Sequence, residues 1–404
     1  MAYLPDNQLK VDLTSRAAES RARTFDVVMA VWGSEFRQVF LDVCVPNQLT
    51  PGNLGALPPG SRYRVFTSQE DAHAFESSPV LQRIAAVIPV DIVVMGELSA
   101  VSRNRFNRLT ACHRRALTDA RERDAGIIFL MADHVISEGA LAAALRRHSA
   151  GSRAVMCTGL RVNREEFVGT LRARGGVGGV PPRDLVSAAL PHLHSFTHTH
   201  MIGTRRTSVY PIGVCWPVAG EGILARYCFL HPLLVDPLRR DVLPGGTIDE
   251  HYIKRTCPVR EQVHVVADSD ELVVFEMSPA GATLTDTRRG GMSRWRAAAM
   301  ISHCDSHQQS YWAQPIRLHA SDVGPVWDAV EERSARFADQ ATRVWRARRW
   351  LTLRYVKVQV RRAAKRFSGR RVRRSVDLVT HSAARRLHKF RKRAARAGRR
   401  VLVR

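Results

Sequence analysis

Asp133 and His134 are the residues of this chain whose types and position point most directly to chemistry. They follow the apolar Ile, Phe and Leu run that opens residues 125–137, and such a run is typical of a buried strand in a parallel sheet. Open α/β sheets bind ligands at the carboxyl ends of these strands. A carboxylate beside an imidazole suits Mn²⁺ or Mg²⁺ holding a diphosphate. The alternative is that Asp133 caps the next helix and His134 is exposed.

The surrounding pattern predicts the elements that would position these two residues. Strands are expected over residues 25–31, 64–68, 91–95, 125–132 and 153–158, and helices over residues 35–45, 69–76, 107–123 and 139–147. This alternation predicts an α/β fold with a doubly wound, mostly parallel sheet flanked by helices. After Asn163 the alternation weakens. Residues 172–183 are rich in Gly and Pro and form either a plain loop or a substrate lid.

Charge separates the end of the chain from the rest. The formal net charge is +25, yet residues 343–404 contain 24 Lys and Arg against the single acid Asp377, so 23 of these charges lie there. The first 342 residues are nearly neutral, with 38 basic and 36 acidic residues. Basicity is therefore a property of a tail and not of the α/β fold.

The remaining composition indicates a cytoplasmic location. Residues 1–20 lack the apolar core of a secretory signal, and the most apolar run, residues 84–96, is too short to span a bilayer. The seven cysteines are scattered without C-x-x-C spacing, which indicates neither a disulfide framework nor a Cys-type zinc site. We expect three parts: a polar leader (1–23), an α/β domain (24–323, with halves 24–162 and 163–323) and a basic helical tail (324–404).

The strand order and the acidic segment resemble the GT-A fold of nucleotide-sugar glycosyltransferases, over about residues 25–276. The metal motif of that family is usually Asp-x-Asp; here Asp133 and His134 stand in its place, and Val135 replaces the second carboxylate. The resemblance implies that His231, at the end of a later strand, completes the metal or diphosphate site. A strand-end histidine without a role is the alternative.

The same resemblance implies further site residues. Asp249, or next to it Glu250, would be the catalytic base that takes a proton from the acceptor hydroxyl; helix-capping acids are the alternative. Candidate contacts to the nucleotide are Trp32, Thr67, Arg103, Asn107 and His113. The implied cofactor is Mn²⁺ or Mg²⁺. The implied reaction moves a sugar from a nucleotide-sugar donor to a polysaccharide or lipid-linked acceptor.

Two other classes of function compete with this interpretation. A nucleic-acid-binding protein would use the Arg-rich tail, but the near-neutral first 342 residues and the few tail aromatics argue against nucleic acid as the partner. A nucleotidyltransferase would need Arg and Lys in a Gly-rich loop after its first strand, where this chain has Trp32 to Glu35.

Three other clusters of polar residues are weaker candidates for a functional site. The histidines between His192 and His200 match no zinc spacing, and residues 302–307 lack a second ligand pair. Asp268, Asp270 and Glu271 are interpreted as a solvated turn between two strands.

The tail itself shows an amphipathic pattern. Val376, Val379, Ala383, Leu387 and Phe390 recur at helical spacing among many Arg and Lys. We expect residues 343–404 to lie on an anionic membrane surface, which would place the protein peripherally at the cytoplasmic face of the inner membrane. A solvated basic tail is the alternative.

Overall fold

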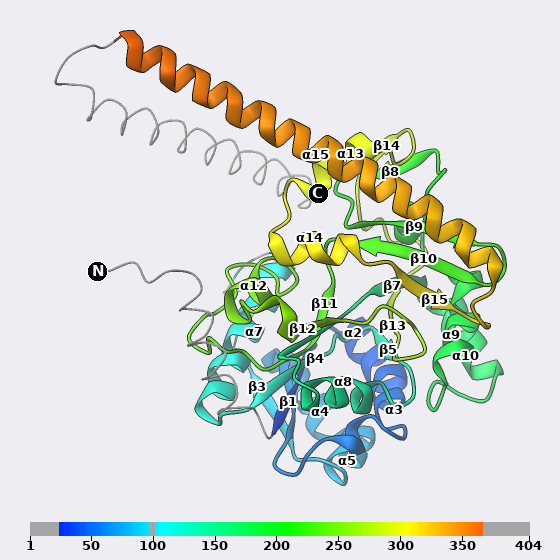
Figure 1. Ribbon diagram of the computed structural model, residues 1–404. Coiled ribbons are helices and arrows are strands. Elements are labelled where there is room, and N and C mark those ends of the chain that lie inside the picture. Colours follow the sequence, from blue (N-terminus) through cyan, green and yellow to red (C-terminus); the bar gives the residue numbers. More distant parts are fainter. Residues whose placement is uncertain (1–23, 97–101, 103, 367–404) are drawn as a thin grey trace. The chain divides into compact units, whose positions relative to one another are not determined.

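The computed structural model describes residues 24–96, 102 and 104–366, with side chains up to residue 348 (Figure 1). It divides into two compact units. The first comprises residues 1–292 and 303–336, and the second comprises residues 293–302 and 337–404. All strands of the described residues belong to the first unit.

A seven-stranded sheet forms the centre of the first unit. Its order is β12-β6-β11-β4-β1-β2-β3. The strands are β1 (Phe25–Ala30), β2 (Arg62–Thr67), β3 (Val90–Val94), β4 (Gly126–Phe129), β6 (Ala154–Cys157), β11 (His231–Val235) and β12 (Val263–Val265). Neighbouring strands are parallel except β11, which runs antiparallel to both β4 and β6. The expectation of a mostly parallel sheet flanked by helices is confirmed, with β11 as an exception that the sequence did not predict.

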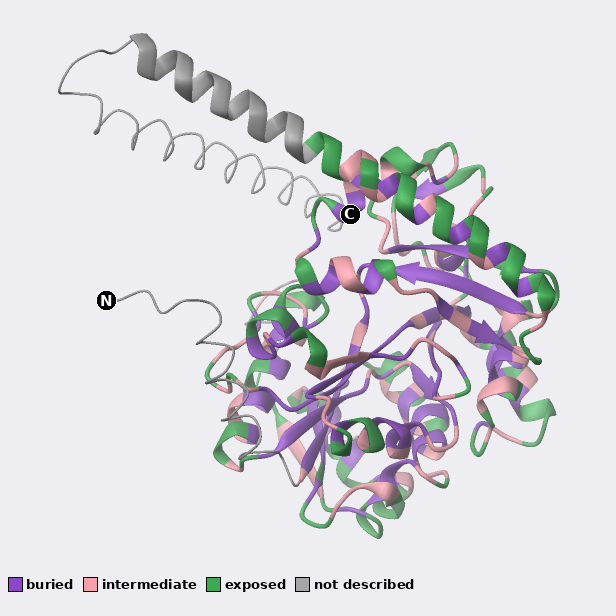
Figure 2. Cartoon of the chain, in the orientation of Figure 1, coloured by how far each residue is buried: buried purple, intermediate pink, exposed green. Residues whose placement is uncertain are grey.

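Burial explains the apolar composition of the central strands. Every residue of β1, β4 and β6 is buried, including the polar Asp26 (Figure 2). Helix α7 (Arg105–Glu122) packs against β1 and β4, and α8 (Ala140–Ser149) packs against β6 and β11. Because both faces of a parallel sheet are covered, its strands carry continuous apolar runs.

Three smaller sheets complete the first unit. The sheet β5-β13-β7 contains β5 (His134–Ile136), β13 (Val274–Ser278) and β7 (Gly159–Asn163). The sheet β15-β10-β9 contains β15 (Ile316–His319), β10 (Gly222–Tyr227) and β9 (Gly213–Val218), and a two-stranded ribbon pairs β14 (Thr287–Arg289) with β8 (Arg206–Ser208). These pairings join segments far apart in the chain, so the local pattern could not predict them.

Shorter helices surround the sheets, and local sequence signals set where several begin. The first-unit helices besides α7 and α8 are α2 (Ser34–Val39), α3 (Val45–Gln48), α4 (Gln69–Glu76), α5 (Pro79–Ala85), α9 (Arg164–Ala173), α10 (Pro182–Ala189), α11 (Ser195–His198), α12 (Tyr252–Thr256) and α14 (Ser306–Ala313). The Ser68 hydroxyl caps α4, and Asp305 with Gln308 forms a capping box on α14.

Two predicted elements differ from the structure. The helix expected over residues 35–45 is divided into α2, a π-helical turn (Phe40–Cys44) and α3. The strand expected over residues 125–132 ends at Phe129, and β5 begins at His134. Between them the chain leaves the central sheet, and the Met277 amide donates a hydrogen bond of 2.8 Å to the Asp133 carbonyl. Asp133 therefore lies where two sheets meet.

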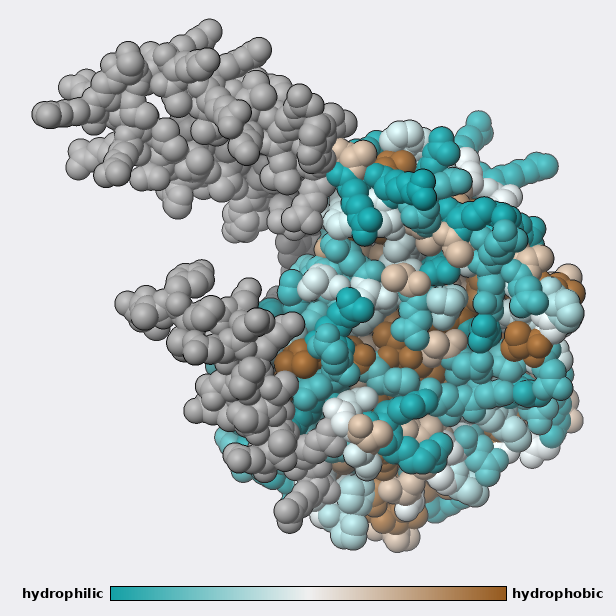
Figure 3. All heavy atoms as spheres, in the orientation of Figure 1, coloured by the Kyte–Doolittle hydropathy of each residue, from teal (hydrophilic) through white to brown (hydrophobic). Residues whose placement is uncertain are grey.

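The second unit contains α13 (Arg294–Ile301) and most of α15 (Pro325–Arg366). Within it the Arg348 guanidinium lies 5.3 Å from the ring centre of Trp295, and Arg343 pairs with Asp339 at 2.6 Å. No helix of the described residues is long and apolar enough to cross a membrane. The face of the molecule in Figure 3 is largely hydrophilic, with scattered apolar side chains. The apolar positions expected over residues 376–390 lie outside the described residues.

Candidate active site

Asp133, Glu276 and Arg161 form the charged centre of the candidate site. Strand register places them together: Glu276 of β13 lies opposite His134 of β5 and beside Arg161 of β7. One guanidinium nitrogen of Arg161 forms an ion pair with Glu276, and another lies 3.8 Å from an Asp133 carboxylate oxygen. All three side chains are half-buried. A single cation thus lies between two carboxylates at the junction of two sheets.

The two carboxyl groups are hard to ionise in this setting. Burial, reinforced by the neighbouring Glu276 carboxylate, raises the pKa of Asp133 to about 6 even though Arg161 opposes the shift. Burial also raises the pKa of Glu276, and the charge of Asp249 adds to that rise. Sites where burial and like charges raise carboxyl pKa values are candidates for function, because added positive charge there is strongly favourable.

Three histidines lie near this centre or next to one another. The rings of His134 and His231 pack edge to face with centroids 4.8 Å apart, and His113 packs in the same way on Phe129 at 5.1 Å. The Nε2–H of His231 donates to the Phe129 carbonyl at 2.7 Å, which leaves its Nδ1 with a lone pair. Neither ring nitrogen of His134 or His113 has a hydrogen-bond partner among the described residues.

Burial keeps these imidazoles neutral. It lowers the pKa of His113 to about 3, places the pKa of His134 well below its usual value and lowers the pKa of His231. Neutral imidazoles retain a lone pair that a metal ion can use. His134 is fully buried, so the alternative of an exposed histidine is wrong.

Asp249 and Glu250 lie on the segment that leads into α12. Both residues are exposed, and the charge of Asp249 acts on His231 and on Glu276. Helix α7 holds the start of this segment, because Thr110 donates to the Gly246 carbonyl at 3.1 Å and Arg114 donates to the Pro244 carbonyl at 2.7 Å. The structure therefore brings Asp249 into the electrostatic field of the charged centre.

The expected nucleotide contacts occupy different environments. Trp32 is half-buried after β1, just before Gly33. The φ of 85° at Gly33 and the hydrogen bond that its N–H donates to the Asp71 carboxylate (2.7 Å) turn the chain into α2. Thr67 ends β2 and is fully buried, without a partner for its hydroxyl among the described residues. Asn107 is exposed and donates to Ser102 at 3.1 Å. Arg103 lies outside the described residues.

A cavity of about 480 Å³ is lined by residues of α11 and of the segments 204–206 and 283–287. Phe196 forms part of its wall, and the Arg161 guanidinium lies 5.7 Å from the ring centre of that residue. The full lining is Ser195, Phe196, His198, Thr199, Thr204, Arg205, Arg206, Thr283, Leu284, Thr285 and Thr287. Hydroxyl groups and guanidinium groups in one cavity, next to an aromatic ring, suit a polar ligand that carries negative charge.

The sequence did not indicate some of the residues that the structure brings together. Arg161 and Glu276 were not candidates, although a glutamate inside the apolar β13 was a signal that a charged site faces that strand. Asp268 and Asp270, interpreted as a solvated turn, lie with His319 in a group that could hold a metal ion. Their Asp-x-Asp spacing was visible in the sequence, but the approach of His319, some fifty residues later, was not.

Comparisons with known proteins give little further information. No protein-family model and no curated protein matches the sequence. Among solved structures, mouse xyloside xylosyltransferase 1 in its apo form matches with a TM-score of 0.26 and 5% identity. The match covers 38% of this chain and 59% of that structure. A likeness at that level supports no inference about activity.

Proposed function

We propose that this protein is a glycosyltransferase that moves a sugar from a nucleotide-diphosphate donor to a glycan or lipid-linked acceptor. The observation that carries the proposal is the pair of half-buried carboxyl groups, Asp133 and Glu276, held around Arg161 where β4 gives way to β5. Ligands of open α/β sheets bind at this edge, beyond the carboxyl ends of the parallel strands. An acidic segment after β4, beside a sheet built on β1 and β2, is also what the GT-A resemblance requires.

The residue types at this centre would suit a divalent cation, although among the described residues only Asp268, Asp270 and His319 bring three ligand atoms within 4.8 Å of one another. Asp133 and Glu276 offer carboxylate oxygens, and Nδ1 of His231 offers a nitrogen whose orientation is fixed by the bond from Nε2–H to Phe129. A mixed oxygen and nitrogen set suits Mn²⁺ better than Mg²⁺, which prefers oxygen alone. When bound, the cation would offset the charge that develops on the leaving diphosphate. His134 lies behind this set as its buried, neutral support.

The other residues have roles that follow from their charge and position. Arg161 holds the two carboxylates together and offers positive charge to the donor phosphates. Asp249, exposed and next to the centre, takes the proton from the acceptor hydroxyl as the new bond forms. Trp32 and Thr67, at the ends of β1 and β2, are the proposed contacts to the nucleoside.

The cavity lined in part by α11 is the proposed acceptor site. It adjoins Arg161 through Phe196, so an acceptor bound there would place a hydroxyl near the charged centre. Arg205 and Arg206 at its wall favour an acceptor that carries a carboxylate or a phosphate. Residues 343–404 would hold the enzyme on the anionic cytoplasmic face of the membrane, where lipid-linked acceptors are found.

A donor screen tests the proposal. Thermal unfolding of the full chain is measured with UDP-, GDP- and dTDP-sugars, each with and without Mn²⁺. One donor class is expected to raise the melting temperature only when Mn²⁺ is present, because a ligand that binds the native state stabilises it by about 2.7 kcal/mol at a hundred times its Kd. Asp241→Asn, at an exposed position, serves as the control. If no nucleotide sugar stabilises the protein, the proposal is wrong.

A further inference from the structure

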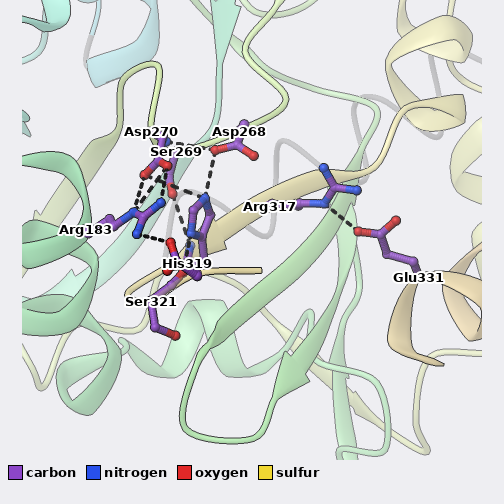
Figure 4. Close-up of polar contacts among 9 residues, drawn as sticks. Arg183, Asp268, Ser269, Asp270, Arg317, His319, Ser321 and Glu331 are labelled. Atoms are coloured by element: carbon purple, nitrogen blue, oxygen red, sulfur yellow. Dashed lines mark hydrogen bonds and ion pairs between the residues drawn. The ribbon is translucent and has the colours of Figure 1, made fainter. Parts of the chain in front are cut away.

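Asp268, Asp270 and His319 converge in a group of side chains that could hold a metal ion (Figure 4). The His319 Nε2 atom lies 2.8 Å from Oδ1 of Asp268 and 3.7 Å from Oδ1 of Asp270. One ligand atom from each residue lies within 4.8 Å of the others. Two ligands at about 2.1 Å from a tetrahedral ion are about 3.4 Å apart. The observed separations bracket that value.

The surroundings of His319 favour a positive charge next to its Nε2 atom. The side chain is only 2% exposed, and its Nδ1 lies 2.7 Å from the Ser321 carbonyl, which can only accept a hydrogen bond. Nδ1 therefore carries the proton, and in the neutral ring Nε2 carries a lone pair. That lone pair faces a carboxylate oxygen of Asp268, so two acceptors meet unless a positive charge lies with them. This backbone-anchored tautomer is the one that metal-ligating histidines adopt.

The charge around the group is also unbalanced. Three carboxylates gather here, those of Asp268, Asp270 and Asp322, and Arg183 pairs with the last two. With a neutral His319, the described ion-pair partners leave a surplus of two negative charges, which one divalent cation would cancel. Arg183 donates to Asp270 Oδ1 at 2.9 Å and to Oδ2 at 2.8 and 3.2 Å, so Oδ1 is the oxygen that keeps a lone pair for a metal.

The backbone already holds the ligands in place. The Ser269 amide donates to the Arg317 carbonyl at 2.9 Å, and the His319 amide donates to the Ser269 hydroxyl at 3.1 Å. The turn after β12 is thus fixed to the end of β15 before any ion binds. Preorganised ligands lose little conformational entropy on binding, which favours affinity.

This group is distinct from the charged centre. Asp268 and Asp270 precede β13, and the Ser137 amide bonds to Val273 near the start of that strand. The Met277 amide, near the other end of β13, donates a hydrogen bond to the Asp133 carbonyl. Four residues of extended chain separate Val273 from Met277, or about 13 Å. The two groups therefore lie toward opposite ends of the same strand.

We propose that Asp268, Asp270 and His319 bind one divalent transition-metal ion, Zn²⁺ or Mn²⁺, that fastens the 268–270 turn to the end of β15. The imidazole ligand favours these ions over Mg²⁺ and Ca²⁺, which prefer oxygen ligands. The ion would be structural, because it joins segments of different sheets at a distance from the charged centre. The inference does not depend on the proposed transferase activity.

Calorimetric titration tests the site. The full chain is stripped of metal with a chelator and titrated with Zn²⁺ and, separately, with Mn²⁺. Asp268→Asn and His319→Gln are expected to lose one bound equivalent and at least about 100-fold in affinity for it, since even outer-shell changes cost 10–100-fold. They should also lose the metal-induced rise in melting temperature. Asp268→Asn replaces a partly exposed side chain with one of the same shape, so it should fold.

Two control variants separate the possible results. Glu331→Gln removes a carboxylate that pairs with Arg317 near the group and should bind metal as the unmodified chain does. Asp133→Asn should also keep this equivalent, which separates the site from the one proposed for sugar transfer. The proposal is overturned if Asp268→Asn and His319→Gln bind metal like the unmodified chain. It is also overturned if no metal binds at millimolar concentration, in which case a proton on Nε2 balances the charge.

Discussion

The surroundings of Asp133 favour the neutral form of its carboxyl group. A carboxyl group that served only to stabilise the fold would gain nothing from such surroundings. It is buried to about four-fifths of its side-chain surface and shares Arg161 with Glu276. Its pKa of about 6, against an ordinary value of 3.8, means that folding opposes its ionisation at neutral pH. A bound cation would reverse that penalty. We infer that the protein retains this loss of folding stability because the ionised carboxylate binds a ligand.

The first prediction concerns the stability of Asp133→Asn. Because the folded-state pKa is raised, the native state binds the extra proton between pH 4 and pH 6, and the ionisation penalty grows over this window as pH rises. The amide cannot ionise, so the variant should be more stable than the unmodified chain above pH 6, by about 1–3 kcal/mol. Below pH 4 the difference should vanish. Urea unfolding at several pH values in a chelating buffer measures it, and a less stable variant at pH 7.5 would show that Asp133 supports the fold.

The second prediction concerns Asp249 as the base. Asp249→Asn should lower the rate of transfer by ~10²–10⁴ while donor binding stays unchanged, because an exposed amide keeps the shape but cannot accept the proton. Glu250→Gln is the matched control and should retain most activity. Parallel loss of donor affinity in Asp249→Asn would assign this residue to sugar binding instead. A product of retained anomeric configuration would also contradict the base role.

At the scale of elements, the sheet β5-β13-β7 assembles the charged centre. Its register sets Glu276 between His134 and Arg161, and these residues come from three segments separated by up to about 140 positions. Each strand is only three to five residues long, so its stability depends on pairing with the others. The centre should therefore respond as a unit to changes in any one of the three strands.

The third prediction tests this coupling. Arg161 lowers the pKa of both Asp133 and Glu276, so Arg161→Met should raise both values further. Since metal and donor binding require the ionised carboxylates, the acid limb of the pH–activity profile should move to higher pH. Arg161→Lys should move it less. The dependence of kcat/KM on pH measures the shift, and an unmoved profile would show that Arg161 does not control these groups.

Local patterns in the sequence predicted the strands and helices in the first half of the chain. They could not predict how segments distant in the sequence pair. The central strands were recognisable because apolar runs such as that of β1 are buried on both faces, and α4 carries its capping serine. Asp133 and His134 could be selected because they follow a buried strand. His231 was expected at the end of a strand, but it is the first residue of β11. Arg161 and Glu276 could not, because only the register of β7 with β13 brings them together. His319 and Asp268 likewise lie together only because segments distant in the sequence pair with each other.

At the scale of the whole molecule, the net charge and the candidate site occupy different parts of the chain. The charged centre and the cavity beside Phe196 lie in the first unit, and residues 343–404 carry most of the net positive charge. Helix α15 continues to Arg366, so the beginning of this basic stretch is helical. A separate basic segment would bring the protein to an anionic surface without altering the candidate site.

The fourth prediction concerns this basic segment. The intact chain should sediment with anionic vesicles but not with neutral ones, and high salt should release it, because each basic residue near an anionic leaflet contributes about 1 kcal/mol. A chain ending at Thr342 should remain in solution while it keeps donor hydrolysis. Equal partition of the two chains would exclude the membrane role. Retention of the intact chain on duplex DNA at physiological salt, without vesicle binding, would favour a nucleic-acid partner.

The most direct test of the central claim is release of nucleoside diphosphate, measured with the donor that stabilises the protein. The intact chain should release it in the presence of Mn²⁺, and faster when acceptor is added. Asp133→Asn should show no release although it remains folded, and Asp241→Asn should match the unmodified chain. Turnover by Asp133→Asn at the rate of the unmodified chain would contradict the account.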